Sequence, residues 1–309
     1  MGRVVVVGQV ARDLVLQIDR MPDEGGSTPV LNRRELLGGK GANQAVACVQ
    51  LGADVELIGV VGEDYAGQEV LREAAANGIG IDGVVRRSGA PTALLVDVVE
   101  PHGVRRLLED VDDRVLLSEQ DIRHSEARLK SAAAVLVQLQ QPQAALLAAL
   151  DAAAAGAALV VADGAPSDED TRRQVLDHAD VVRADAAETE ALVGWQPQDL
   201  DQTIDAARTL LAEGPDIVAL AVPTGGNVVA WHEGHVELPF LEEDEVDPTG
   251  AGDAFIAALT VALLEGEEPV AAAWWAAVAA SRVVTTIGGR PDLSLSSVRE
   301  QAHQARKDS

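Results

Sequence analysis

Residues 247–255 read DPTGAGDAF, and this stretch decides how the rest of the chain is interpreted. Gly250 and Gly252 allow bare backbone N–H groups to converge where an apolar helix begins, and the N-terminus of a helix attracts anions. Asp253 adds a carboxylate to the first turn, where it can accept a proton from a group that attacks the bound anion. An anion site and a base within one helical turn predict a phosphoryl-transfer centre.

A second glycine-rich stretch, residues 38–45, reads GGKGANQA and opens another predicted helix about 200 residues earlier in the chain. The two motifs, in this order and at this separation, resemble the ribokinase family of carbohydrate kinases, also called the phosphofructokinase-B family. The resemblance covers essentially the whole chain. It implies a ribokinase-like three-layer α/β sandwich and the transfer of the γ-phosphoryl group of ATP to a sugar hydroxyl.

The hydrophobic pattern along the chain predicts the same fold class. Short β-branched runs alternate with helical stretches, which is typical of a mostly parallel sheet with helices on both faces. The predicted buried strands are residues 4–8, 55–61, 135–139, 159–163 and 217–222. The predicted helices are residues 41–51, 66–77, 144–155, 168–178, 203–212, 252–264 and 271–285. Ligands of such sheets collect at the carboxyl ends of the strands.

Two segments, residues 11–37 and 91–114, interrupt this alternation with extended stretches. We interpret them as one small β-sheet lid over the strand ends, where a lid can exclude water from a reactive phosphate. A pair of ordinary surface hairpins is the alternative interpretation. The predicted main α/β domain, which binds nucleotide and substrate, then comprises residues 1–10, 38–90 and 115–309, and the small β-lid comprises residues 11–37 plus 91–114.

Composition limits the classes of partner and location. The formal net charge of −26 at pH 7 argues against a nucleic-acid partner, because no basic patch could dominate such a field. This acidity fits either a salt-tolerant surface or a bias of the whole proteome. The single cysteine, Cys48, cannot form a disulfide within the chain, and no signal peptide or membrane span is expected. We therefore expect a cytoplasmic enzyme.

The resemblance assigns the catalytic groups to the late motif. Asp253 is implied to be the general base that deprotonates the acceptor hydroxyl. The loop from Gly250 through Ala251 and Gly252 is implied to form the anion hole for the transferring phosphoryl group. The alternative role for Asp253 is to cap the helix, since Asp is favoured in a first turn.

The resemblance assigns the sugar pocket to the early motif. Gly38, Gly39, Lys40 and Asn43 are implied to line it, and Asp13 is implied to accept hydrogen bonds from two acceptor hydroxyls. A turn residue after the first strand is the alternative role for Asp13. A nucleotide P-loop is not expected here, because the chain lacks GxxxxGK[ST].

The acceptor pocket departs from the ribokinase pattern. Ala11 stands where ribokinases carry Asn, Gln140 where they carry Glu, and residues 112–114 read DDR where Gly-Ala-Asn is common. Gln140 can still bind a hydroxyl, but it is neutral and donates as well as accepts. The catalytic loop matches the family and supports kinase chemistry, whereas the departures in the acceptor pocket put ribose itself in doubt.

On the nucleotide side, Asp185 and Glu188 fall where the family carries Asn-x-x-Glu. Glu188 is expected to organise Mg²⁺ through water, which suits a cation that keeps several waters. A solvated helix face is the alternative role for Glu188. The further expected nucleotide contacts are Thr224, Gly225, Gly226 and Gly288.

Many relatives also bind a monovalent cation, so the resemblance suggests K⁺ beside the anion hole, held by Asp247 and the carbonyl of Thr249. The implied partners are MgATP and a small sugar, with a homodimer through the lid as a family expectation only. Two alternatives stay open: a nucleoside kinase of the same mechanism, and a non-catalytic sugar-binding regulator. Arg12, Arg33 and Arg34 are the basic residues that would argue for a phosphosugar acceptor instead.

Overall fold

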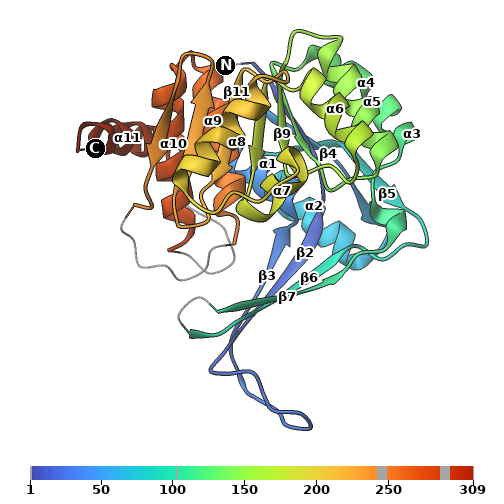
Figure 1. Cartoon of the computed structure of the whole chain (residues 1–309). Coiled ribbons are helices and arrows are strands. Elements are labelled where there is room, and N and C mark those ends of the chain that lie inside the picture. The colour runs from blue at the N-terminus through green and yellow to red at the C-terminus, as the bar shows by residue number, and fades with distance from the viewer. Residues whose placement is uncertain (1, 102–103, 242–248, 286–292, 309) are drawn as a thin grey trace.

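The computed structural model describes residues 2–101, 104–241, 249–285 and 293–308. Within these residues the strands form a nine-stranded sheet and a separate four-stranded sheet, and helices cover the larger sheet (Figure 1). The predicted mixed α/β class with a large, mostly parallel sheet and a small second sheet is confirmed.

The nine-stranded sheet has the order β13-β12-β11-β10-β9-β8-β1-β4-β5. All neighbouring pairs from β5 to β11 are parallel, while β12 and β13 extend the sheet in antiparallel fashion. Parallel strands direct their carboxyl ends to one edge, where ligands gather. The bounds are β1 Val4–Val7, β4 Val55–Gly62, β5 Gly80–Arg87, β8 Ala134–Gln138, β9 Leu159–Asp163, β10 Val181–Ala184, β11 Ile217–Ala221, β12 Asn227–Trp231 and β13 Gly234–Leu238.

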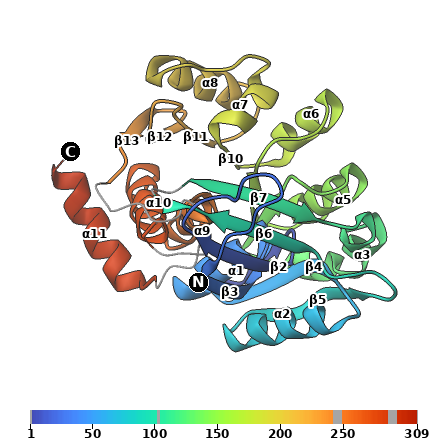
Figure 2. The same cartoon turned by 90° about the horizontal axis from the view of Figure 1, so that it is seen from below.

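Helices pack on both faces of this sheet, and Figure 2 shows the two groups on opposite sides. One face is covered by α1 Lys40–Gln50, α2 Tyr65–Ala76, α9 Ala251–Leu264, α10 Pro269–Val283 and α11 Leu295–Asp308. The other is covered by α3 Glu119–His124, α4 Glu126–Ser131, α5 Gln143–Ala154, α6 Glu169–His178, α7 Ala186–Val193 and α8 Leu200–Leu211. The two hydrophobic cores therefore lie on either side of the sheet.

The centre of the sheet follows from its sequence. Strand β1 consists of four valines, all buried, and it pairs in parallel with β4 and β8. A continuous β-branched run of this kind suits a strand that is covered on both faces. Alanine-rich α9 packs against α1, which brings the two glycine-rich motifs to the same place in the fold.

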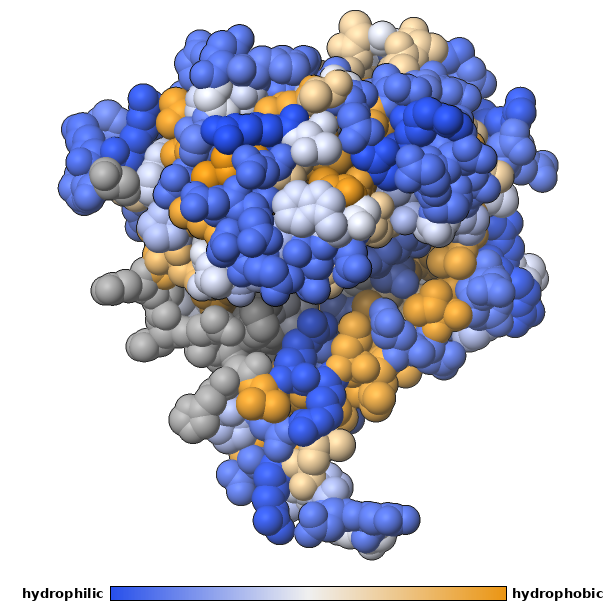
Figure 3. Space-filling model, viewed as in Figure 1, coloured by the Kyte–Doolittle hydropathy of each residue, from blue (hydrophilic) through white to orange (hydrophobic). Residues whose placement is uncertain are grey.

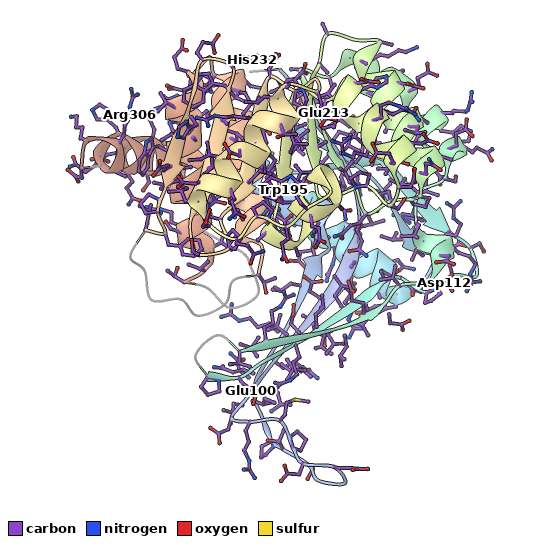
Figure 4. The ribbon with its side chains drawn as sticks, in the orientation of Figure 1. Glu100, Asp112, Trp195, Glu213, His232 and Arg306 are labelled. Atoms are coloured by element: carbon purple, nitrogen blue, oxygen red, sulfur yellow. The ribbon has the colours of Figure 1, made fainter. Side chains whose placement is uncertain are left out.

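The four-stranded sheet lies below the main sheet in Figure 1 and has the order β3-β2-β6-β7. Its strands are β2 Ala11–Ile18, β3 Val30–Gly38, β6 Leu94–Val99 and β7 Arg105–Asp110. Glu100, labelled on this sheet in Figure 4, accepts a hydrogen bond from the backbone N–H of Met21 at 3.0 Å, which ties the two insertions together. The sheet is thus a single unit, while the predicted domain boundaries stay a prediction.

Hydrophobic side chains remain exposed on this small sheet, as Figure 3 shows. Leu31 on the edge strand β3 is 64% exposed, and Leu108 on the opposite edge strand β7 is 61% exposed. Exposed apolar groups on edge strands are typical of surfaces that meet another chain.

Four strands of the main sheet were not predicted: β5, β10, β12 and β13. Strand β10 is only four residues long and contains Arg183, so its sequence lacks the apolar run that marked its neighbours. Strand β5 carries charged and half-exposed residues because it forms an edge. No helix in the described part of the chain has the length and hydrophobicity needed to cross a membrane.

Candidate active site

Helix α9 begins at the late glycine-rich motif. Gly250 precedes it with a φ of 77°, in the left-handed region that glycine adopts readily. The first hydrogen bond of the helix runs from the N–H of Ala254 to the carbonyl of Gly250 at 2.9 Å. The N–H groups of Ala251, Gly252 and Asp253 therefore precede the helical ladder, where they give the helix N-terminus its partial positive charge.

Asp253 lies buried at the contact between α9 and α1. Its Oδ2 accepts a hydrogen bond from Nδ2 of Asn43 at 3.3 Å, and its Oδ1 accepts one from Nε2 of Gln44 at 3.2 Å. Within the described residues these bonds come from α1 and none comes from the backbone of α9. The side chain of Asp253 therefore bonds to α1 and does not cap α9.

The surroundings of Asp253 change its proton affinity. Burial raises the pKa of the Asp253 carboxyl from 3.8 to about 7, and the nearby charge of Asp163 acts in the same direction. Lys40, Arg183 and the hydrogen bond from Asn43 oppose this effect. A carboxyl group with a pKa near 7 is suited to general base catalysis at neutral pH.

Two further charged residues at the site were missed in the sequence. Asp163, at the carboxyl end of β9, is 1% exposed and accepts hydrogen bonds from Gln44 at 2.8 Å and from Nη1 of Arg183 at 3.0 Å. Arg183 lies on the neighbouring strand β10. The available signal for Asp163 was a carboxylate at the end of a predicted buried strand, whereas Arg183 lay in a strand that was not predicted.

Lys40 and Gln140 both contact Glu188. The Nζ of Lys40 lies 3.1 Å from Oε1 of Glu188, and Nε2 of Gln140 donates to the same oxygen at 3.5 Å. Nε2 of Gln138 in turn donates a hydrogen bond to Oε1 of Gln140 at 3.1 Å. The structure therefore joins the early motif, the central strand β8 and the start of α7.

Glu188 also takes part in the N-terminal capping of α7. Its Oε2 accepts a hydrogen bond from the N–H of Asp185 at 2.9 Å, while Oδ1 of Asp185 accepts from Ala187 and Glu188. The described residues contain no group of three or more acidic, histidine or cysteine side chains that could hold a metal by themselves. The expected role of Glu188 in organising Mg²⁺ through water stays a prediction.

The early motif lies against Asp13. A Cβ atom added to Gly38 would lie 1.8 Å from Cγ of Asp13, so the buried carboxylate occupies the place of a side chain there. Gly39 precedes α1 with a φ of 86°. Asp13, Gly38 and Gly39 thus adjoin Lys40 and Asn43 at the start of α1, while their role as a sugar pocket stays a prediction.

Residues 112–114 have a structural role. Asp112 caps the short 3₁₀ helix Asp113–Val115, and Nη1 of Arg114 donates to the carbonyl of Gly89 at 2.8 Å. Figure 4 shows Asp112 at the periphery of the molecule. The departure from Gly-Ala-Asn at this place therefore coincides with a turn that stabilises the surface.

A cavity of ≈ 490 Å³ opens between the β11–β12 turn, α9 and α10. Its volume lies within the range of about 300–1,000 Å³ that is usual for small-molecule sites. It is lined by Arg183, Gly226, Phe240, Gly252, Phe255 and Ser281, among others. Gly226 borders this cavity with a φ of 90°, Gly225 lies beside Phe240, and Thr224 is outside the lining. Asp247 and Gly288 lie outside the described residues, and Thr249 precedes Gly250, the N-cap residue of α9.

The chain is similar to known proteins along its full length. The family model described as pfkB family carbohydrate kinase matches residues 1–295. An ATP-dependent ribose-1-phosphate kinase from Halopiger xanaduensis is 30% identical over 259 residues, which cover 83% of each protein. The ribokinase of Bacillus subtilis is 28% identical over 297 residues, covering 94% of this chain and 95% of that one.

Two further comparisons concern length and fold. The chain spans 48% of a bifunctional ribokinase/ribose-5-phosphate isomerase A from Fructilactobacillus sanfranciscensis, with 25% identity over 260 residues. The structure of Arabidopsis thaliana ribokinase complexed with ribose and ATP superimposes with a TM-score of 0.81 at 25% identity, covering 97% of this chain and 98% of that one.

Proposed function

The chain belongs to the pfkB family of carbohydrate kinases, and we propose that it transfers the γ-phosphoryl group of MgATP to a hydroxyl group of ribose or a related sugar. The observation that carries this proposal is the position of Asp253. A buried carboxyl group with a pKa of about 7 stands in the first turn of α9 and contacts Asn43 of the early motif. A base and an anion site within one helical turn suit phosphoryl transfer to an alcohol.

In the proposed reaction the acceptor oxygen attacks the γ-phosphorus. A new P–O bond forms to the sugar, the bond between the γ-phosphorus and the β–γ bridging oxygen breaks, and ADP leaves. Asp253 takes the proton of the attacking hydroxyl. The N–H groups of Ala251, Gly252 and Asp253 stabilise charge on the phosphoryl oxygens, because this end of α9 carries unsatisfied donors.

The acceptor is placed by the early motif in this proposal. Asp13 accepts hydrogen bonds from sugar hydroxyls beside Gly38 and Gly39, and Lys40 and Asn43 complete the pocket. Gln140 contributes a neutral amide that Gln138 and Glu188 keep oriented. The cavity between α9 and α10 is the proposed site of the adenosine moiety, since it is largely apolar and borders Gly252.

Cations complete the proposed site. Mg²⁺ neutralises charge on the β- and γ-phosphates, with Glu188 orienting its water ligands. K⁺ is proposed beside the anion hole, held by Asp247 and the carbonyl of Thr249.

We propose a neutral sugar rather than a phosphosugar as the acceptor, because Glu35 pairs with two arginines of the lid. Arg12 forms an ion pair with Glu35 at 2.7 Å, and Arg33 lies 3.8 Å from the same carboxylate. Two of the basic residues that would recognise a second phosphate are therefore already partly neutralised by Glu35. The kinship to a protein named for ribose 1-phosphate keeps that compound among the acceptors to be tested.

The test is ADP release from MgATP, with K⁺ present, across pentoses, hexoses, phosphosugars and nucleosides. Turnover of ribose would establish that Ala11 and Gln140 are tolerated replacements. Turnover of a nucleoside alone would replace the sugar proposal with the nucleoside kinase. Silence with every acceptor, from protein that still binds MgATP, would favour the non-catalytic regulator.

A further inference from the structure

Arg183 lies against the backbone of the late motif. A Cβ atom added to Gly252 would lie 2.5 Å from Nη2 of Arg183 and 2.8 Å from its Cζ. The guanidinium therefore occupies the space in which any other residue at position 252 would carry its side chain. This contact places a positive charge directly beside the N-terminus of α9.

A hydrogen bond to Asp163 fixes the orientation of the Arg183 guanidinium. Nη1 of Arg183 donates to Oδ1 of Asp163 at 3.0 Å, and Asp163 is in turn held by Gln44 at 2.8 Å. The Arg183 side chain is 13% exposed, and it lines the cavity between the β11–β12 turn and α10. The charged group thus borders both the cavity and Gly252, the residue that precedes Asp253.

Most of the donors of Arg183 have no acceptor among the described residues. A guanidinium carries five N–H donors, and here one hydrogen bond, to Asp163, is formed. The remaining Arg183 donors are reached by solvent, because none of them is a buried atom that lacks a partner. The unused donors can therefore bind an anion that enters the cavity, in exchange for water.

A second buried arginine, Arg172, shows how a guanidinium with a purely structural role is bonded in this protein. Arg172 is similarly buried, with 12% exposure, but its donors are used by Glu213 through two bonds of 2.7 Å, by the carbonyl of Leu192 and by Glu169. Arg172 joins helices, and its guanidinium is satisfied by the protein alone. Arg183 has a comparable burial without comparable partners.

We infer that Arg183 is a further catalytic residue, which donates hydrogen bonds to oxygens of the phosphoryl group during transfer. This inference rests on the proposed kinase function. As the bond from the acceptor oxygen to the γ-phosphorus forms and the bridging bond to ADP breaks, negative charge redistributes over the phosphoryl and leaving oxygens. Arg183 stabilises that charge and exchanges no proton, because a guanidinium stays protonated. The proton still passes from the acceptor hydroxyl to Asp253.

Asp163 is a positioning residue in this scheme. It holds Nη1 of the guanidinium, whose Nη1, Nη2 and Cζ atoms all lie against Gly252 while the side chain borders the cavity. Removing a single donor to a developing oxyanion costs about 10²–10³ in kcat, and an arginine that contacts a transferring phosphoryl group contributes about 10³–10⁵. We therefore expect Arg183→Gln to lower kcat by about 10²–10³.

The experiment compares Arg183→Gln with Arg172→Gln, which removes an equally buried arginine away from the site. Steady-state kinetics use the best acceptor of the wild-type protein. We expect Arg183→Gln to lose kcat while its KM for the acceptor changes by less than about threefold, since the lost contact belongs to the transition state. Arg172→Gln should lose thermal stability and keep its kcat. Arg183→Lys, which keeps a cation without the planar fork, should have an intermediate kcat.

A second measurement does not depend on turnover. Calorimetry compares the affinity for MgADP alone with the affinity for MgADP plus aluminium fluoride and the acceptor, a mixture that imitates the transferring group. Wild-type protein should bind the mixture more tightly, and Arg183→Gln should lose that gain while it keeps its affinity for MgADP alone.

The outcomes separate the two proposals. A wild-type protein that turns over no acceptor overturns the kinase function itself. An active wild type with unchanged kcat in Arg183→Gln overturns only the role of Arg183. Equal losses of MgADP affinity and of kcat would show ground-state binding and would also overturn it. If Arg183→Gln does not fold, full activity of Arg183→Lys would contradict the need for the planar fork.

Discussion

Asp163 and Asp253 share one amide donor: Nε2 of Gln44 lies 2.8 Å from Oδ2 of Asp163 and 3.2 Å from Oδ1 of Asp253. All three side chains are buried, and they come from β9, α9 and α1. A negative charge on Asp163 therefore acts on Asp253 at short range, in a setting where water screens little. The proton affinity of the proposed base depends on a residue that does not belong to either motif.

This arrangement predicts a pH dependence. Because Asp253 must be ionised to accept a proton and its pKa is about 7, kcat/KM of the wild-type protein should rise with pH through about 7. In Asp163→Asn the repulsive charge is absent, so the pKa of Asp253 should fall and the acidic limb of the profile should move to lower pH. The profile of kcat/KM is the measurement, with the exposed Asp151→Asn as control. An unmoved limb in an active Asp163→Asn would contradict the coupling.

Asp253→Asn should separate activity from stability. We expect turnover to fall by about 10²–10⁴, the usual contribution of a general base. The folded protein holds the Asp253 proton more tightly than the unfolded chain does, since burial raises its pKa from 3.8 to about 7. The stability of the wild type therefore decreases, through this group, as the pH rises from about 4 to about 7.

Asp253→Asn has no carboxyl group to ionise at this position, so its stability does not fall as the pH rises. Above a pH of about 7 the free energy of unfolding of Asp253→Asn should exceed that of the wild type by up to about 4 kcal/mol. Thermal unfolding of both proteins at acidic and at mildly alkaline pH checks the sign. A variant that is less stable than the wild type at alkaline pH would contradict the shifted pKa. Near-normal turnover would refute the role of Asp253 as base.

Gly38→Ala should act on the acceptor. The new methyl group would overlap Cγ of Asp13, at 1.8 Å, and force that carboxylate out of place. Overpacking of this kind costs about 1–3 kcal/mol of stability. We expect KM for the sugar to rise about tenfold or more, with a smaller change in the KM for ATP. Gly234→Ala, whose methyl group meets only Trp231 at ordinary contact distance, is the matched control.

Potassium should activate the enzyme if a cation binds beside the anion hole. We compare rates in K⁺ with rates in tetramethylammonium at the same ionic strength, because a bound cation adds positive charge near the N-terminus of α9. The proposed ligands include Asp247, so Asp247→Asn should reduce the difference between the two salts. Equal rates of the wild type in both salts would remove potassium from the proposal.

The lid predicts self-association. Leu31 and Leu108 expose apolar surface on opposite edge strands of the four-stranded sheet. We expect a homodimer by light scattering, and a shift to monomer in the double variant Leu31→Glu/Leu108→Glu. The exposed Tyr65 on α2, changed to Glu, serves as control. A monomeric wild-type protein at high concentration would exclude the interface.

Local signals in the sequence predicted the fold and the two glycine-rich motifs that meet at the candidate site. The start of α9 and the start of α1 were predicted because glycines, polar residues and an apolar helix follow one another within a few residues. Strands with continuous β-branched runs were predicted because such runs suit strands that are covered on both faces. The resemblance of both motifs to one family assigned Asn43 to the sugar pocket and Asp253 the role of base, but it did not predict the hydrogen bond between them.

The other half of the site depends on strand order, which no local pattern contains. Asp163 and Arg183 face each other because β9 and β10 are neighbours in the sheet. The sequence around Arg183 reads VVRA, which is too short, and interrupted by a charged residue, to indicate a buried strand. Gln44 was treated only as part of a motif, although its amide joins both carboxylates.

The net charge of −26 has a consequence for the speed of nucleotide encounter. ATP is an anion, and it approaches a strongly acidic molecule whose cations at the site, Lys40 and Arg183, are already paired with Glu188 and Asp163. At a distance the nucleotide is therefore repelled, and it is attracted only once it reaches the end of α9. Salt shortens the reach of the repulsion to about 10 Å at 0.1 M, so added salt should accelerate association, in contrast to the usual slowing of steered binding.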